Sequence, residues 1–185
     1  MTESPDFHKK EEAMSETYYK WLTPDRTTTY QGVKWPKRVG VWTPNEPPAL
    51  CASGWHLATF EGIGTHASDN AVLWIAEGRG ENDKQNDKIA FTSARLVSEV
   101  GTLTQAIAVQ WSIECAKRTL KHYEARYPTD KRARQAIQAA AKWMKNPTEK
   151  NASAASAAYS AAAGAAERKW QSNCLLALLA ATKQD

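Results

Sequence analysis

The stretch DKIAFTSARLVSEVGTLTQAIAVQW, residues 87–111, contains the change of pattern that decides the fold. Before Gly101, apolar side chains such as Ile89 and Phe91 alternate with small or polar residues, which is typical of a β-strand. After Gly101, apolar side chains recur at helical spacing behind Thr104, a residue type that often caps helices. The sequence therefore predicts a strand before Gly101 and a helix from Thr104 onward.

Upstream of this stretch, proline and glycine divide the chain into short segments. Five of the eight prolines lie between Pro24 and Pro48, and both residue types break helices and form turns. The segment AVLWIAEG, residues 71–78, predicts a second strand, and GRGENDKQND, residues 78–87, predicts a charged loop between the two strands. We expect a β-rich unit over residues 18–100, preceded by a flexible tail or loosely docked helix over residues 1–17.

Downstream, the pattern predicts three helices over residues 101–185. The first helix should end before Pro128, because proline disfavours helical conformation in the preceding residue. Asp130 is the expected cap of the second helix, and Thr148 that of a third, which is alanine-rich over residues 152–166 and roughly 50 Å long if continuous. The alanine-rich helix could pack on the other two helices or form a dimer seam, so monomer and dimer both stay open.

The predicted fold class is α+β: a small β-rich unit packed on a three-helix unit that contains a long Ala-rich helix. With 42% hydrophobic and 24% charged residues, the composition is that of a globular protein. Three widely spaced cysteines give no disulfide framework and fit a reducing compartment. The N-terminus has no apolar signal segment, and CLLALLAA is too short to span a bilayer. We therefore expect no membrane partner and a cytoplasmic location.

The segment LCASGWH, residues 50–56, raises the question of a catalytic or metal site. Cys51 and His56 could form a nucleophile and its base, but such pairs usually come from distant segments. Cys51, His56 and His66 could supply three zinc ligands, yet no C-x-x-C or H-x-x-x-H pair supports this. We expect Gly54 to form a turn, Cys51 to be structural and His56 to contribute a hydrogen bond, with no metal and no cofactor.

The segment EGRGE, residues 77–81, lacks the pattern of a phosphate-binding loop. Glu77 and Glu81 could act as paired carboxylates, but no other motif of such a site accompanies them. The candidate catalytic residues are therefore His56 and Glu77.

The charge is unevenly spread along the chain. Residues 1–100 carry 11 Lys and Arg against 14 Asp and Glu, whereas residues 101–185 carry 13 against 6. This excess indicates either the ordinary solvated surface of a helical bundle or a basic face for an acidic partner of the helical unit. Carboxylates lie between the basic residues and no recognised nucleic-acid-binding module is present, which counts against a nucleic-acid interface. Nucleic acid stays open as a partner. The candidate partner-binding residues are Lys117, Lys121, Arg132, Arg134, Lys142 and Lys145.

The order of short motifs resembles that of a family of small uncharacterised proteins found in phages and high-GC bacteria. The motifs are YKxL at 19–22, GxWTP at 40–44, LCxxGWH at 50–56, LWxAEGRG at 73–80 and SARLV at 93–97. The helical half, with PTDKRARQAIQAAAKWM at 128–144 and ERKWQSNCLLALL at 167–179, looks like immunity-protein-like domains. Together these resemblances cover roughly residues 18–180 and imply a phage or prophage accessory protein.

Three functional hypotheses follow. We expect a non-catalytic binder that modulates or inhibits a host protein, such as a host defence complex, because the chain is small and lacks a catalytic motif. The alternative is an NAD-dependent, ADP-ribosyltransferase-like enzyme that acts on a host target and uses His56 with Glu77 or Glu99. The lack of a Glu-x-Glu motif counts against that enzyme. A nucleic-acid-binding accessory protein is the third hypothesis.

Overall fold

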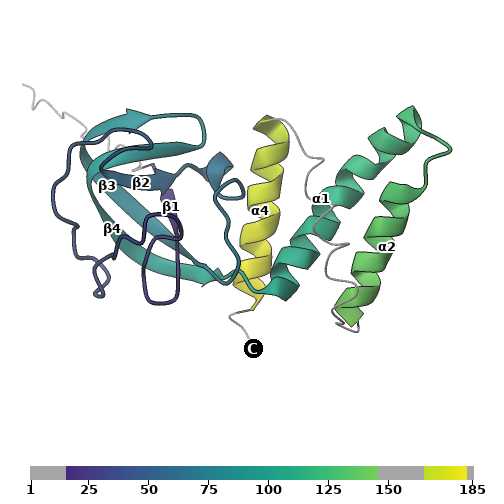
Figure 1. Ribbon diagram of the computed structural model, residues 1–185, viewed down its shortest axis with the longest axis horizontal. Helices are drawn as coiled ribbons and strands as arrows, with labels where there is room; N and C mark the ends of the chain where they lie inside the picture. The colour runs from purple at the N-terminus through teal and green to yellow at the C-terminus, as the bar shows by residue number, and fades with distance from the viewer. Residues whose placement is uncertain (1–15, 146–164, 183–185) are drawn as a thin grey trace, which may run out of the picture.

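The computed structural model describes residues 16–145 and 165–182. It confirms the predicted α+β class, because an antiparallel β-sheet forms the N-terminal part and α-helices form the C-terminal part (Figure 1). The strands of the described chain are β1 (Tyr18–Leu22), β2 (Trp55–Ala58), β3 (Val72–Lys84) and β4 (Lys88–Thr102). Its helices are the short 3-10 helix η1 (Phe60–Gly62), α1 (Gln105–Arg126), α2 (Arg132–Lys145) and α4 (Ala165–Ala181).

The four strands close into a small barrel in the order β1-β2-β4-β3, with β3 returning to pair with β1. The β3–β4 hairpin forms most of the ladder. By contrast, β1 and β2 share one pair, Tyr19 with Ala58, so the barrel is least tightly closed between these two strands. This junction is where the candidate site opens.

The prediction of a charged loop over residues 78–87 is wrong. Strand β3 continues to Lys84, and only residues 85–87 separate it from β4. The pairing shifts register between Arg79 and Asn82, next to Gly80, whose φ of +82° suits glycine. The bulge lets the strand continue, and the outer part of β3 is exposed, so charged side chains are tolerated there.

Strand alternation places a lysine on the row that faces the barrel core. Tyr18 and Leu22 of β1 belong to the barrel core, together with Trp35 and Trp55. Because side chains two positions apart share a face of a strand, Lys20 lies on the same row as Tyr18 and Leu22. The segment YYKWL thus carries a cation toward the interior.

A second core joins the barrel to the helices. It contains Trp21 and Leu73 from the strands, Trp111 from α1, and Leu175 and Leu179 from α4, both of which are fully buried. Two indole groups add hydrogen bonds across this core. Trp21 Nε1 donates to the Ile63 carbonyl oxygen at 2.9 Å, and Trp111 Nε1 donates to that of Gln171 at 3.0 Å.

The predicted helix signals near Gly101 are confirmed. Thr104 Oγ1 accepts a hydrogen bond from the Ile107 amide at 3.3 Å, and α1 ends at Arg126, before Pro128. Asp130 Oδ1 accepts a hydrogen bond from the first amide of α2, that of Arg132, at 3.0 Å. The predicted cap at Thr148, most of the alanine-rich segment and residues 1–15 of the predicted tail lie outside the described residues.

Candidate functional site

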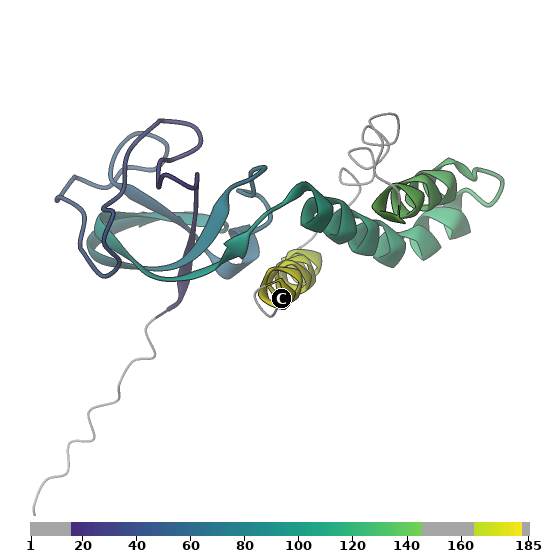
Figure 2. The same ribbon diagram turned by 90° about the horizontal axis from the view of Figure 1, so that it is seen from below.

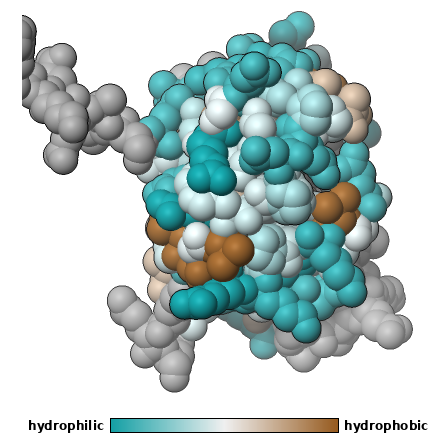
Figure 3. Space-filling model, turned by 90° about the vertical axis from the view of Figure 1, so that its left-hand side faces the viewer, coloured by the Kyte–Doolittle hydropathy of each residue, from teal (hydrophilic) through white to brown (hydrophobic). Residues whose placement is uncertain are grey.

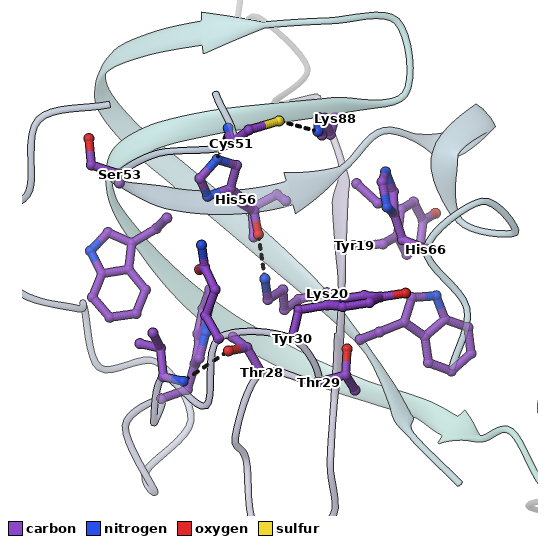
Figure 4. A pocket seen from close by; sticks show the side chains of 18 of the residues that line it. Tyr19, Lys20, Thr28, Thr29, Tyr30, Cys51, Ser53, His56, His66 and Lys88 are labelled. Carbon is purple, nitrogen blue, oxygen red and sulfur yellow. Dashed lines mark hydrogen bonds between the residues drawn. The ribbon is translucent and has the colours of Figure 1, made fainter. Parts of the chain in front are cut away.

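A pocket of about 770 Å³ lies beside the loosely paired β1 and β2 (Figure 4). Its walls come from β1, from β2 and the turn before it, and from the loop over residues 28–35. Segments far apart in the sequence thus meet at this pocket. The titratable residues that line it are Tyr19, Lys20, Tyr30, Glu46, Cys51, His56, His66 and Lys88.

Lys20 is the most perturbed charge in the pocket. Its Nζ donates a hydrogen bond to the His56 carbonyl oxygen at 2.8 Å and lies 5.5 Å from the centroid of the Trp35 ring. Burial lowers the pKa of Lys20 to about 8, because the interior disfavours the charged form. Among the described residues, no carboxylate forms a salt bridge with this ammonium group.

His56 contributes a hydrogen bond, as predicted, but it does not serve Cys51 as a base. Its Nε2 accepts a hydrogen bond from the backbone amide of Cys51 at 3.0 Å, which occupies the lone pair that a base would use. Burial and then the nearby Lys20 charge lower the pKa of His56, which favours the neutral ring. Cys51 Sγ lies instead 2.9 Å from Lys88 Nζ, and a dashed line in Figure 4 marks this contact.

The turn that carries Cys51 explains this arrangement. Cys51 has a φ of +62° and Gly54 a φ of +80°, so the chain reverses tightly before β2. A Cβ on Gly54 would lie 2.8 Å from the Pro48 Cα atom, so the close approach requires glycine, which forms the predicted turn. The same turn leaves Cys51 exposed at the pocket rim.

His66 is held by a different partner. Its Nε2 lies 3.2 Å from Asp87 Oδ2, while burial lowers its pKa against the opposing effect of that carboxylate. Within residues 16–145 and 165–182, no three His, Cys, Asp or Glu side chains converge as metal ligands would. Cys51, His56 and His66 therefore surround one pocket without forming a common ligand set.

The second catalytic candidate, Glu77, does not belong to this pocket. Its Oε2 accepts from Arg95 Nη2 at 2.6 Å, across the β3–β4 ladder. The guanidinium groups of Arg95 and Arg79 also lie 4.7 and 4.2 Å from the centroid of the Trp42 ring. Glu77 is thus part of a surface arrangement of two arginines and a tryptophan, and the fold does not bring it together with His56.

The helical part carries the predicted basic residues, but three of the six are ion-paired. Lys117 pairs with Glu114 at 2.9 Å, Arg132 with Asp130 at 2.7 Å and Arg134 with Glu124 at 2.6 Å. The structure gives the other three no salt bridge within the described residues; these are Lys121, Lys142 and Lys145. Because residues two apart on a helix point in different directions, Arg132 and Arg134 do not share a face.

The tip of the α1–α2 hairpin adds an aromatic group that the sequence reasoning did not single out. Tyr127 is 47% exposed, and its ring centroid lies 5.2 Å from that of Tyr123, whose hydroxyl donates to Asp130. The Arg126 guanidinium lies 5.9 Å from the Tyr127 ring. Tyrosine and arginine are enriched among residues that dominate binding interfaces. The sequence does contain a hint of this group, because the segment EARYP, residues 124–128, places an arginine and a tyrosine next to the proline of the turn.

No helix in the described part of the chain is long and apolar enough to cross a bilayer. In the comparison with protein families, residues 98–182 match the model of the family described as Imm-5 like putative immunity protein. No curated protein and no solved structure matches the chain. The helical part, from the end of β4 through α4, is therefore similar to this immunity-protein family, in line with the predicted resemblance, whereas most of the barrel lies outside the match.

Proposed function

We propose that this chain is a non-catalytic binding protein that neutralises a partner protein, which it engages with its helical part. The observation that carries the proposal is the match of residues 98–182 to an immunity-protein family. Immunity proteins act by binding, and complexes of colicin DNases with their immunity proteins are among the tightest known. The resemblance of the barrel motifs to small phage proteins favours a bacterial host protein, such as a component of a defence complex, as the partner.

The arrangement of the helices supports a binding role for α1 and α2. In Figures 1 and 2, α2 lies farthest from the barrel and α1 lies between α2 and the rest of the molecule. Among the described elements, α2 packs extensively only against α1, through Ile137, Ala140 and Trp143. The hairpin therefore extends from the body of the molecule and presents its tip to a partner.

Charge and aromatic character support the same surface. We define the hairpin surface as Lys121, Arg126 and Tyr127 toward the tip, together with Lys142 and Lys145 in the last turn of α2, about 15–20 Å from the tip along that helix. The three lysines have no recorded salt bridge among the described residues, so they can attract an acidic partner, while Tyr127 offers an exposed ring. Charges of this kind mainly increase the association rate, whereas a buried aromatic anchor mainly slows dissociation.

The outer face of the barrel offers less to a protein partner. Figure 3 shows described residues there as largely hydrophilic, with small separate hydrophobic areas. The exposed large apolar side chains on this unit are Tyr30, which is 88% exposed and stands in a loop, and Val33, Val39, Val41 and Val97, each about 40% exposed. Small areas of this kind are normal on monomeric proteins. The barrel face is therefore the weaker candidate for the interface.

The test begins with capture of the partner from a lysate of the cells that produce the chain, followed by kinetics with the purified pair. The reversal Lys121→Glu, Lys142→Glu and Lys145→Glu should slow association about tenfold or more at low salt. The matched control is Lys34→Glu, Lys37→Glu and Arg38→Glu, three exposed cations on the barrel, and should have a much smaller effect.

Tyr127→Ala should speed dissociation. Unchanged kinetics in both hairpin variants would contradict the proposal.

A further inference from the structure

The exposed surface of α1 and α2 carries one sign of charge. Within residues 105–145, every charged side chain that is exposed is a lysine or an arginine. The three carboxylates of this stretch are half-buried, and each forms an ion pair with a neighbouring cation; they are Glu114, Glu124 and Asp130. A molecule that approaches the two helices therefore meets a positively charged surface.

The face of α2 that points away from α1 consists of cations and amides. The helix packs on α1 through Ile137, Ala140 and Trp143. Residues three or four apart share a face of a helix, so a second set of positions lies opposite this packed face. These positions are all exposed, and we call them the outer face of α2: Arg134, Gln135, Gln138, Lys142 and Lys145.

On the outer face of α2, cations lie at both ends and amides lie between them. Arg134 lies near the start of the helix, and Lys142 follows about 12 Å further along its axis. Lys131 and Arg132 add two exposed cations at the first end. At the other end, Lys142 and Lys145 have no salt bridge within the described residues.

The composition of this face favours nucleic acid over an acidic protein as its ligand. Among the described residues, none of the exposed large hydrophobic side chains belongs to α2. Protein interfaces depend on buried aromatic or apolar anchors, whereas nucleic-acid interfaces are more polar and much more positively charged. The outer face of α2 has the charge of a nucleic-acid interface and lacks the anchor of a protein interface.

The shape of the element favours duplex DNA. The major groove of B-form DNA, about 12 Å wide, admits an α-helix, while the deep, narrow major groove of duplex RNA does not. In such a groove, lysine and arginine reach phosphates on either side, and glutamine side chains contact base edges. Figures 1 and 2 show α2 at the end of the molecule farthest from the barrel, where a long duplex has room.

We propose that the outer face of α2 binds double-stranded DNA in the major groove. The cations at its two ends contact phosphates, and Gln135 and Gln138 face the base edges. The inference goes beyond the proposed partner protein and does not rest on it, because the aromatic anchor for that partner, Tyr127, lies at the tip of the hairpin and not on this face.

The first test measures the binding of a fluorescein-labelled DNA duplex of about 20 base pairs to the purified full chain by fluorescence anisotropy. At about 50 mM salt the Kd should be micromolar, and log K should fall against log salt with a slope of about −3 to −4, as three or four phosphate contacts require. A duplex RNA of the same length should bind at least threefold more weakly. Polyglutamate should displace the DNA at least tenfold less effectively than unlabelled DNA does.

Three results of this measurement would overturn the proposal. They are the lack of DNA binding at low salt, equal affinity for duplex RNA, and equal displacement by polyglutamate. Equal affinity for RNA would contradict the insertion of α2 into the major groove. Equal displacement by polyglutamate would assign the outer face of α2 to an acidic protein instead.

A pair of matched charge variants locates the contact with phosphates. Lys142→Gln combined with Lys145→Gln should weaken binding at least fivefold and reduce the size of the salt slope by about two. Lys34→Gln combined with Lys37→Gln removes the same charge from exposed positions of the barrel and should leave both quantities unchanged. Equal effects of the two double variants would mean that DNA responds only to net charge, and would overturn the assignment to α2.

A second set of variants tests the amides and separates this proposal from the partner protein. Gln135→Glu combined with Gln138→Glu should weaken DNA binding at least tenfold, because carboxylates in the groove repel phosphates. Tyr127→Ala should leave DNA binding unchanged, although it speeds dissociation of the partner protein. Wild-type affinity in the folded double glutamate variant, as judged by circular dichroism, would overturn the proposal, and so would a loss of DNA binding in Tyr127→Ala equal to that of the lysine variant.

Discussion

Lys20 Nζ donates a 2.8 Å hydrogen bond to the backbone carbonyl oxygen of His56, and this contact links β1 to β2 where the two strands share one residue pair. A lysine therefore takes part in closing the barrel. Because the ammonium group is partly buried without a carboxylate partner among the described residues, its charge is a cost to the fold.

That cost predicts a specific pH dependence of stability. The pKa of Lys20 is lowered to about 8 in the folded chain and returns to near 10.5 on unfolding, so the unfolded state binds more protons between these values. Lys20 should therefore disfavour folding most fully below pH 8, and this effect should fade as the pH rises toward 10.5. Relative to Lys20→Met, the unaltered chain should gain on the order of 1–3 kcal/mol across that window.

Urea unfolding of both proteins from pH 7 to 10.5 measures this difference. Tyr18 and Cys115, whose pKa values burial raises to about 12, lower stability as the pH rises, but they are present in both proteins and cancel in the comparison. A difference in stability that stays constant over the whole range would show that Lys20 is not desolvated.

Two glycines with similar backbone angles provide a matched test of the turn before β2. Gly54 and Gly40 have φ of +80° and +82°, but a Cβ would meet Pro48 at 2.8 Å on Gly54 and no atom within 4 Å on Gly40. Gly40→Ala should cost about 1–2 kcal/mol of unfolding free energy from backbone strain alone. Gly54→Ala should cost clearly more, as thermal and urea unfolding would reveal; equal losses would argue against the close approach to Pro48.

The shared core predicts that barrel and helices unfold together. Leu175 is fully buried against residues of both parts, so Leu175→Ala should lower the unfolding free energy by about 2–5 kcal/mol. Asn173→Ala, at an exposed position of the same helix, should change it by less than about 0.5 kcal/mol. Separate transitions for tryptophan fluorescence and helical circular dichroism would instead mean that the two parts are independent domains.

The non-catalytic proposal predicts that the two candidate catalytic residues are dispensable for the action on the partner. His56 Nε2 is occupied by the Cys51 amide and Glu77 is bound to Arg95, so neither is arranged for proton transfer. His56→Ala and Glu77→Gln should leave inhibition of the partner unchanged, and NAD should not shift the melting temperature. Loss of inhibition in a folded variant, together with stabilisation by NAD, would favour the enzymatic alternative.

Local signals in the sequence were enough to predict the class of the fold. Thr104 and Pro128 set the limits of α1 because capping and proline geometry act over a few residues. The length of β3 was missed, since a glycine-rich, charged segment has the composition of a loop, and only pairing with β4 makes it a strand. Strand context, not local propensity, decides such cases.

The pocket was harder to predict than the fold. His56 was singled out, but Lys20 was not, because one lysine in YYKWL is compatible with an exposed strand position. Its inward orientation depends on the pairing of β1 with β3, and its neighbours Trp35 and His56 come from segments far along the chain. Such long-range contacts are set by the tertiary fold and leave little trace in local pattern.

Hydrogen–deuterium exchange on the complex tests the proposed mode of binding most directly. Amide exchange is measured for the chain alone and with a saturating amount of its captured partner. The account predicts new protection concentrated in residues 105–145, which form α1, α2 and the tip around Tyr127, with little change over residues 16–58. Protection confined to residues 16–58, with α1 and α2 unaffected, would contradict it and assign partner binding to the barrel.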